Sequence, residues 1–336
     1  MDRRACKRAP VAPARLGFAV KVLGQDGLKS NDSRRWQSNP HLRVSIDYLH
    51  AIFWYLEKSE IRMYRMSSDL APYVTHPDLP QFHRQISESR SELVELGRRA
   101  NQIGLRLSFH PSQFIVMNAP DKKLRRLSVQ DLTCQAEILD LMNLGPEAVL
   151  VIHVGGTYDD KSAAMDRWVA CYQELPEPAR RRLVLENDDL RFSSADVLRI
   201  HERTGVPLVF DIQHHQCLNP ERLSWRPTLE RFLRTWPSGR RPKVHYSSPR
   251  TQTREVVRVN RKTGKQETCL RPPIWTAHAD YIHPFEFIRF LEETQGLEFD
   301  VMLEAKAKDL ALQRLRQDIA YYAPELQERF GRSALQ

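Results

Sequence analysis

Short runs of β-branched, aliphatic and aromatic residues recur along the chain, separated by longer stretches in which apolar residues have a helical spacing. Runs of this length and composition are typical of strands buried on both faces. We predict eight such strands, which cover residues 15–22, 63–68, 106–110, 148–154, 182–187, 207–213, 242–248 and 299–305.

The stretches between these runs predict helices. In residues 45–60, apolar residues lie three, seven and ten positions after Ile46, which places them on one helical face. Residues 128–144 open with Ser128, a residue type that is favoured at a helix N-cap. The other predicted helices cover residues 82–104, 162–175, 193–204, 227–236, 284–296 and 308–322.

Eight strands that are each followed by a helix predict the α/β class and a single-domain (β/α)8 TIM barrel over residues 15–322. The chain has 336 residues, 41% of them hydrophobic, which is enough for one large domain. We find no sequence repeat and no Gly/Ser-rich linker that would divide it. The regular alternation therefore favours one barrel over two smaller domains.

Three segments do not fit the alternation. Residues 1–14 form a basic leader that we expect to be disordered, and residues 323–336 form a C-terminal tail. Residues 250–274 form an insert rich in Arg and Lys between the seventh strand and its helix. The charge of this insert fits two alternatives equally well, a solvated hairpin and a basic flap over a nucleic-acid groove.

The composition indicates a basic protein of a reducing compartment. Lys and Arg total 51 against 42 Asp and Glu, a formal net charge of +9, which favours partners rich in phosphate such as nucleic acid. The five cysteines are scattered without CxxC spacing, so they suggest neither a disulfide framework nor a thiolate zinc site. No apolar run has the length of a membrane span. We expect a soluble, cytoplasmic protein with no membrane partner.

Residues of the types that bind metals gather where the predicted strands end. In a TIM barrel these carboxyl ends form the working face. A single histidine or glutamate at a strand end is more often structural, but the bodies of these strands are apolar while nearly every end is not. The residues in question are His110, His153, Glu186, Asp211, His214, Lys243, His245 and Glu304, with His76 and His278 in neighbouring loops.

Carboxylates that share one barrel mouth repel one another unless cations compensate their charge. Imidazole and carboxylate groups without thiolate suit Zn²⁺, Mn²⁺ or Fe²⁺. Because the set exceeds what one ion needs, we predict two or three divalent ions. Several ions in a basic protein suggest hydrolysis at phosphorus. The absence of P-loop, GxSxG and HExxH motifs gives no support to nucleotide hydrolysis, a serine nucleophile or a zinc peptidase.

The motifs HPSQF, HVGGTYDDK, LVLENDD, FDIQHH, KVHYSS, HADYI and LEAKAKD follow one another on the third to eighth predicted strands. In this order they resemble the UV-damage endonucleases, DNA-repair enzymes related in fold to endonuclease IV, over residues 15–320. The resemblance implies a metal-dependent monomer, usually with manganese and alternatively with zinc or magnesium. It also implies cleavage of double-stranded damaged DNA 5′ of cyclobutane pyrimidine dimers and 6-4 photoproducts, with the damaged bases flipped out.

The resemblance also implies roles for individual residues. Glu186, Glu304 and Lys243 are the expected catalytic residues, and Lys243 matches a lysine that is either carboxylated or a plain ammonium group. The motif match assigns the metal ligands to His76, His110, His153, Glu186, Asp211, His214, His245, His278 and Glu304.

The pair Gln113 and Phe114 matches a glutamine and an aromatic residue that enter the duplex and fill the space left by the flipped bases. An apolar wedge is suited to this because it stacks on bases. The alternative is that Phe114 packs into the core. Phe18 is a further expected DNA or lesion contact. Family members often carry tyrosine at both phenylalanine positions and asparagine where Val22 stands, so the range of lesions is less firmly predicted than strand cleavage.

Three alternatives to this function are an abasic-site endonuclease, a sugar isomerase on the same barrel, and a catalytically silent protein that binds damaged DNA. The pair Gln113–Phe114, the basic charge and the motif order speak against the isomerase. The ligand types retained at nearly every strand end speak against the silent binder.

Overall fold

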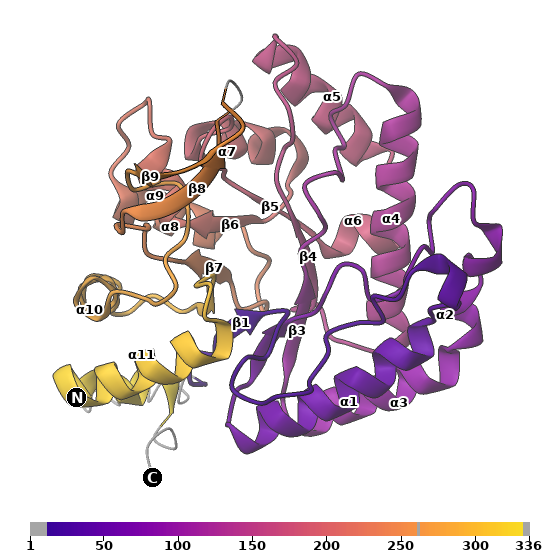
Figure 1. Cartoon of the computed structure of the whole chain (residues 1–336), viewed down its shortest axis with the longest axis horizontal. Helices are drawn as coiled ribbons and strands as arrows, with labels where there is room; N and C mark the ends of the chain where they lie inside the picture. The colour runs from indigo at the N-terminus through magenta and orange to yellow at the C-terminus, as the bar shows by residue number, and fades with distance from the viewer. Residues whose placement is uncertain (1–11, 261–262, 332–336) are drawn as a thin grey trace, which may run out of the picture.

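The computed structural model describes residues 12–260 and 263–331, and eight parallel strands close into a barrel at its centre. Around the barrel the strand order is β1-β10-β7-β6-β5-β4-β3-β2, and β1 pairs with β2 to complete the circle. This is the predicted single-domain TIM barrel (Figure 1). The barrel strands are β1 (Leu16–Ala19), β2 (Met63–Arg65), β3 (Arg106–Phe109), β4 (Val149–Ile152), β5 (Leu183–Glu186), β6 (Leu208–Asp211), β7 (Lys243–Tyr246) and β10 (Asp300–Leu303).

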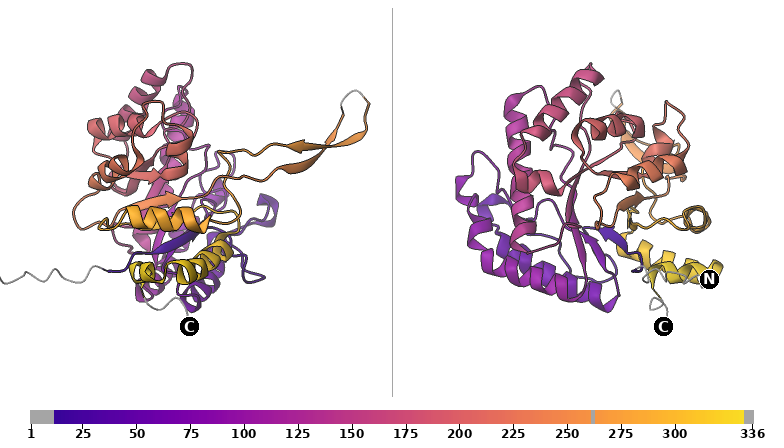
Figure 2. Two further views of the ribbon diagram at one scale, coloured as in Figure 1. Left: turned by 90° about the vertical axis from the view of Figure 1, so that its left-hand side faces the viewer. Right: turned by 180° about the vertical axis from the view of Figure 1, so that it is seen from behind.

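Helices surround the barrel, as the views in Figures 1 and 2 show. Two of them, α6 and α8, are short additions to the predicted pattern. The helices are α1 (Leu42–Lys58), α2 (Gln85–Glu88), α3 (Arg90–Gln102), α4 (Lys122–Leu141), α5 (Lys161–Gln173), α6 (Glu177–Arg182), α7 (Ser194–Thr204), α8 (Ile212–Cys217), α9 (Trp225–Arg234), α10 (Pro284–Glu293) and α11 (Lys308–Tyr322), with the 3-10 turns η1 (Trp36–Ser38), η2 (Pro80–Phe82) and η3 (Pro324–Phe330). No helix in the described ranges is long and apolar enough to cross a membrane.

All eight predicted strands are present, and the helix predicted for residues 308–322 has the predicted bounds. Residues 82–104 are not one helix, because the helical hydrogen bonds are interrupted between α2 and α3 at Ser89. The strand predicted for residues 207–213 ends at Asp211, whose carboxylate accepts the backbone N–H of His214 (2.8 Å) and so caps α8.

The N-cap prediction for Ser128 is wrong. Asp121 caps α4 by accepting the N–H of Lys123, so the helix begins well before Ser128. Ser128 Oγ instead accepts the N–H of Val116 (2.9 Å), which ties the loop after β3 to α4.

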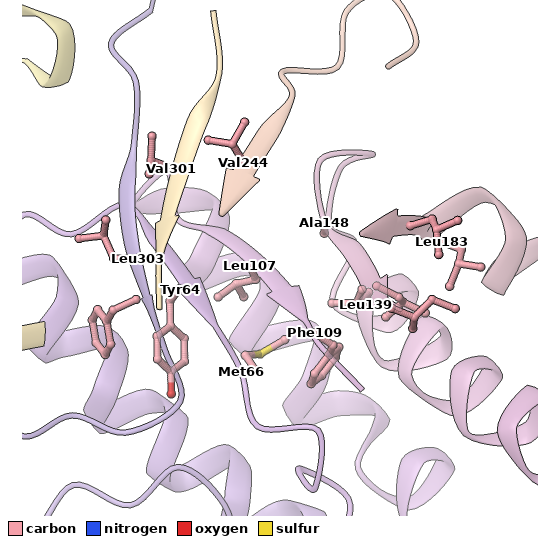
Figure 3. Packing of buried hydrophobic residues seen from close by; sticks show 14 of the residues in the cluster. Tyr64, Met66, Leu107, Phe109, Leu139, Ala148, Leu183, Val244, Val301 and Leu303 are labelled. Atoms are coloured by element: carbon pink, nitrogen blue, oxygen red, sulfur yellow. The ribbon is translucent and has the colours of Figure 1, made fainter. Parts of the chain in front are cut away.

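Alternation along each strand divides the core into two parts. Outward side chains such as Leu107, Phe109 and Val301 pack against helix residues in one large cluster, part of which is drawn in Figure 3. Valines of β4, β5 and β6 and the ring of Trp236 form a second, smaller cluster. Because side chains alternate with a period of two, the valine positions share a face with the functional residues further along each strand.

A buried ion network lies at the amino ends of the strands. Asp300 is fully buried, and one of its oxygens lies 2.9 Å from Arg15 Nη1 and 2.8 Å from Arg106 Nη1. Its other oxygen lies 3.2 Å from Arg241 Nε. This network joins β1, β3 and β10 at the end of the barrel opposite the working face.

Most of the predicted N-terminal leader and the end of the predicted tail are not part of the described structure. Residues 1–11 of the leader and 332–336 of the tail lie outside the described residues. Within the described part, Ala14 donates its backbone N–H to Arg329 O (2.7 Å), so the start of the domain contacts η3.

We predict that Asp300→Ala lowers the free energy of unfolding by about 3–5 kcal/mol, because it leaves the buried guanidinium of Arg106 without its carboxylate. Asp300→Asn should lose less, since the amide keeps the volume and one acceptor. Urea denaturation measures both. As a control, Glu95→Ala, which removes an exposed i,i+3 pair with Arg98, should leave the transition unchanged. Equal stability of Asp300→Ala and wild type would show that the network does not support the barrel.

Candidate active site

The carboxyl ends of the strands bring their polar side chains into one mouth. His110 and His153 follow β3 and β4, while Glu186, Asp211 and His245 lie within β5, β6 and β7. Each occupies a position two or four residues beyond a buried residue on the same face of its strand, so alternation aims all five inward. The valines below them are apolar and small, which leaves the polar layer at the top of the lumen.

Glu186 is the centre of this layer. Its Oε2 lies 3.0 Å from His110 Nε2 and 3.7 Å from His153 Nε2. Its Oε1 lies 2.8 Å from His245 Nδ1 and 3.6 Å from His214 Nδ1. Burial acts to raise the pKa of this carboxyl, but the surrounding histidines hold it well below the ordinary value. The surrounding histidines thus favour the ionised form of Glu186 although the side chain is completely buried.

Glu304, which directly follows β10, is the second carboxylate of the mouth. Its Oε1 lies 3.3 Å from His245 Nδ1, and its Oε2 lies 3.7 Å from His278 Nδ1. Arg65 on β2 forms an ion pair with the same carboxylate. Burial opposes ionisation here too, yet Arg65 and His245 hold the pKa of Glu304 well below its ordinary value.

Asp211 and His214 form the third part of the mouth. Burial raises the pKa of Asp211 to about 7. For His214, burial lowers the pKa, but Asp211 and Glu186 outweigh it and raise the value to about 9. The amide of Asn187 holds the end of β6 by donating to Asp211 O (3.0 Å) and accepting the Asp211 N–H (2.9 Å).

Several polar atoms of the mouth are buried without a hydrogen-bond partner in the described chain, which is costly unless a ligand satisfies them. These atoms are Asp211 Oδ2, His153 Nδ1, His245 Nε2 and Lys243 Nζ. Burial lowers the pKa of Lys243 well below its ordinary value, and Arg106 and Arg65 add to the effect. Lys243 lies two residues before His245 on β7 and so faces the lumen directly beneath it.

Two groups of side chains offer donor atoms that lie within 4.8 Å of one another. The first consists of His110, Glu186, His245 and Glu304, and the second of His153, Glu186 and His214. Nitrogen and oxygen donors without sulfur fit Mn²⁺, Zn²⁺ or Fe²⁺. The donor set, the unsatisfied atoms and the buried carboxylates together fit divalent cations, and Glu186 belongs to both groups.

Two predicted residues are not part of the mouth. His76 is in the loop after β2, where its Nδ1 accepts the N–H of Asp78 (3.3 Å), and it belongs to neither donor group. Phe18 is fully buried and packs edge-on against Tyr64, with 5.4 Å between ring centroids. The prediction that Phe18 contacts DNA is wrong, because the outward alternation of β1 buries it among core residues.

The loop after β3 presents Gln113 and Phe114 at the surface. Phe114 is 78% exposed, so the alternative in which it packs into the core is wrong. Its neighbours hold the backbone in place, because Ile115 N–H donates to Ser112 O (2.9 Å) and Val116 N–H donates to Ser128 Oγ. The exposed ring of Phe114 is therefore carried by a loop whose backbone is held by hydrogen bonds.

A pocket of about 570 Å³ lies between this loop and the histidines of the two donor groups. The residues that line it include His110, His153, His214, Gln113 and Tyr158. A Cβ at Gly156 would lie 2.9 Å from the ring of Tyr158. Any other residue at this position would therefore require the Tyr158 ring to move.

A family model described as "UV-endonuclease UvdE" matches residues 42–330. A UV DNA damage endonuclease from Bacillus velezensis is 34% identical over 263 residues, which cover 77% of this chain and 75% of that protein. The chain belongs to the UV-endonuclease UvdE family.

One solved structure supports this assignment, and a second shares the fold. The crystal structure of SacUVDE matches with a TM-score of 0.74 and 29% identity, and covers 94% of this chain and 98% of that one. Endonuclease IV from Thermus thermophilus matches with a TM-score of 0.51 and 13% identity over 91% of this chain and 98% of that one. The second match shows a shared fold alone.

Arg65 and Asn187 contribute to this UvdE-family site but were missed from the sequence. A cationic side chain inside the apolar run MYRM was a usable signal for Arg65, because an arginine in a buried strand needs a carboxylate partner. Asn187 lies in the quoted motif LVLENDD, but nothing in the sequence shows that it links β5 to β6.

We predict that metal content follows the two donor groups. Glu186→Gln should lose most bound Mn²⁺ because the carboxylate serves both groups, whereas His153→Gln should lose about one ion per chain. Elemental analysis after dialysis against Mn²⁺ measures this. His201→Gln, which changes a histidine that contacts Val206 O away from the mouth, is the matched control, and His76→Gln tests a predicted ligand that lies outside both donor groups. Full metal content in Glu186→Gln would contradict the shared site.

Proposed function

We propose that this protein is a DNA-repair endonuclease that hydrolyses the phosphodiester 5′ of cyclobutane pyrimidine dimers and 6-4 photoproducts in double-stranded DNA. The observation that carries the proposal is the pair of donor groups that share Glu186 beside a pocket and an exposed aromatic loop. Relatives named UV DNA damage endonucleases support the substrate. Family membership favours this function over a sugar isomerase.

Divalent cations, with Mn²⁺ expected, would supply a nucleophile at neutral pH and would neutralise the charge that develops as the leaving oxygen departs from phosphorus. Glu186 and Glu304 would hold them from the centre of the mouth, together with the histidines and Asp211. Arg65 keeps Glu304 ionised and in place through its ion pair. His76 remains a predicted ligand that would have to act from the loop after β2.

Lys243 is proposed as a catalytic residue because a completely buried amine without a hydrogen-bond partner in the described chain faces the same lumen. Its lowered pKa favours the neutral amine. A neutral amine can add CO₂ and lose a proton to form a carbamate, which would provide a further carboxylate-type donor beside the donor groups; the plain lysine is the alternative. Native mass spectrometry at near-neutral pH, where an acid-labile carbamate survives, distinguishes the two.

The loop after β3 is proposed to recognise the lesion. Phe114 is suited to stack on bases because most of its surface is exposed and no core contact has to be broken. Gln113 lines the pocket next to it and offers an amide to base edges. Unstacking a damaged step costs less than unstacking an intact one, which would provide selectivity. The volume of about 570 Å³ provides space for flipped bases beside His110.

We predict Mn²⁺-dependent cleavage of a 5′-labelled duplex immediately 5′ of a single thymine dimer, with an undamaged duplex left intact. Glu186→Ala and Glu304→Ala should each reduce the rate by at least about a hundredfold, because each removes a central carboxylate. Denaturing gel electrophoresis of the labelled strand measures the cut. Glu95→Ala, an exposed carboxylate on α3, is the matched control.

Two results would overturn this function. A shift of the damaged duplex in a native gel without any cutting would identify a silent damaged-DNA binder. Cutting confined to an abasic duplex would identify an abasic-site endonuclease.

We further predict that Phe114→Ala lowers affinity for the thymine-dimer duplex by about 10- to 100-fold, since base stacking on an aromatic ring contributes about 1–3 kcal/mol. Bound metal should be unchanged, whereas His110→Ala should lose metal and cleavage together. Fluorescence anisotropy and elemental analysis give the two readouts. Trp54→Ala, an exposed aromatic on α1, controls for loss of a surface ring. Unchanged affinity and selectivity in Phe114→Ala would exclude the wedge.

A further inference from the structure

The insert between β7 and α10 forms an antiparallel hairpin of β8 (Arg254–Val259) and β9 (Gln266–Arg271). In the left view of Figure 2 the hairpin extends away from the rest of the molecule. Residues 250–274 contain seven Arg or Lys and only two Glu, so they hold a large share of the chain's net charge of +9. Neither of the two donor groups and no part of the pocket lining described above includes a residue of this segment.

The register of the hairpin separates its side chains into two faces. Arg254 lies opposite Arg271, and the next pair on the same face is Val256 and Cys269. Arg258 follows two residues after Val256, so Arg254, Arg258 and Arg271 lie on one face of the hairpin. The other face carries Val257, Val259 and Leu270, which are 60%, 61% and 69% exposed. We call the first the basic face and the second the apolar face.

The basic face is unfavourable in isolation. Arg254 and Arg271 are direct cross-strand partners, and like charges in this position destabilise a hairpin. Glu267 lies opposite Arg258, but its Oε1 accepts a hydrogen bond from Asn260 Nδ2 (2.7 Å). A two-stranded hairpin on its own is marginally stable as well. An anionic partner that lies across the basic face would remove the repulsion.

The base of the hairpin is fixed to the rim of the mouth. Pro249 and His278 form a β-bridge, and Ala279 donates its N–H to Ser248 O (2.8 Å). Gln213, which directly precedes His214, donates a hydrogen bond from Nε2 to the backbone oxygen of Trp275 (2.9 Å). The hairpin therefore begins beside a proposed metal ligand, and a duplex positioned at the mouth passes near it.

We propose that the hairpin is an arm that holds the substrate duplex outside the lesion, with Arg254, Arg258 and Arg271 against the phosphate backbone. The proposal rests on the proposed function, which places duplex DNA at the mouth. Six-residue strands give the arm a length of ~20 Å, and a two-stranded ribbon fits a DNA groove. Because phosphates carry no sequence information, the arm would add affinity and orientation without base preference.

The test uses the full chain with Mn²⁺ and an undamaged duplex, whose binding does not depend on cleavage. In the basic-face variant, Arg254, Arg258 and Arg271 are replaced by threonine, which keeps a high strand propensity. The matched control replaces Lys58, Arg203 and Arg234 by glutamine, three cations in the last turns of their helices, away from the mouth. A second variant replaces residues 253–272 by a short glycine linker.

We predict that the basic-face variant binds the duplex at least about tenfold more weakly at physiological salt. The slope of log K against log salt concentration should become shallower by about 2 to 3, as expected for three lost phosphate contacts. The linker variant should show the same loss, and the control should match wild type. Cleavage of the dimer duplex at saturating enzyme should persist in the basic-face variant, because the metal cluster is intact.

If the basic-face and linker variants bind the undamaged duplex with wild-type affinity and the wild-type salt slope, the proposal that the hairpin binds DNA is wrong. The proposal is also overturned if only exchange of Val257, Val259 and Leu270 for threonine has an effect and wild type sediments as a dimer, because the occupant is then a second copy of this chain. Failure of wild type to cut the dimer duplex would instead overturn the proposed function, since the binding measurements on undamaged DNA are independent of cutting.

Discussion

A closed parallel barrel with strands of three or four residues forces alternate side chains into a lumen that water does not fill. Every polar group placed there needs a partner. At the amino ends the protein meets most of this need itself, because Asp300 is surrounded by three arginines, although Arg106 Nη2 has no hydrogen-bond partner in the described chain. At the carboxyl ends it is met in part, by Arg65 and by histidines, and the remaining unsatisfied atoms define the mouth. The candidate active site is thus the part of the lumen where buried carboxylate and imidazole groups keep atoms without a partner in the described chain.

Much of this arrangement was predictable from the sequence because the period of the pattern changes at each element. Buried runs gave all eight strands, and the polar residues at their ends gave nearly all the members of the cluster. The failures have local causes. Ser128 looked like a helix cap because the sequence does not show that its hydroxyl binds Val116 N–H in another loop. Phe18 was expected at the DNA through resemblance, whereas alternation along β1 points it into the core.

Contacts between distant segments were beyond prediction. The pairing of Arg65 with Glu304 joins residues 239 positions apart, and only the closed barrel brings β2 and the end of β10 to one mouth. The insert posed the same problem, since its charge alone fitted two alternatives. The register of β8 and β9 resolves the hairpin into faces, and it shows that two arginines meet across the strands. Membership of the UvdE family then gives a DNA context in which such a face has a use.

Glu186 contributes to both donor groups, and this has a thermodynamic consequence. Two ions that share a carboxylate cannot bind independently, because the first to arrive changes both the charge and the orientation available to the second. Reciprocity requires the second to influence the first by the same free energy. Loading of the two proposed ions would therefore be a linked equilibrium, in which a change at His153 in one donor group alters binding at His245 in the other through the shared carboxylate of Glu186.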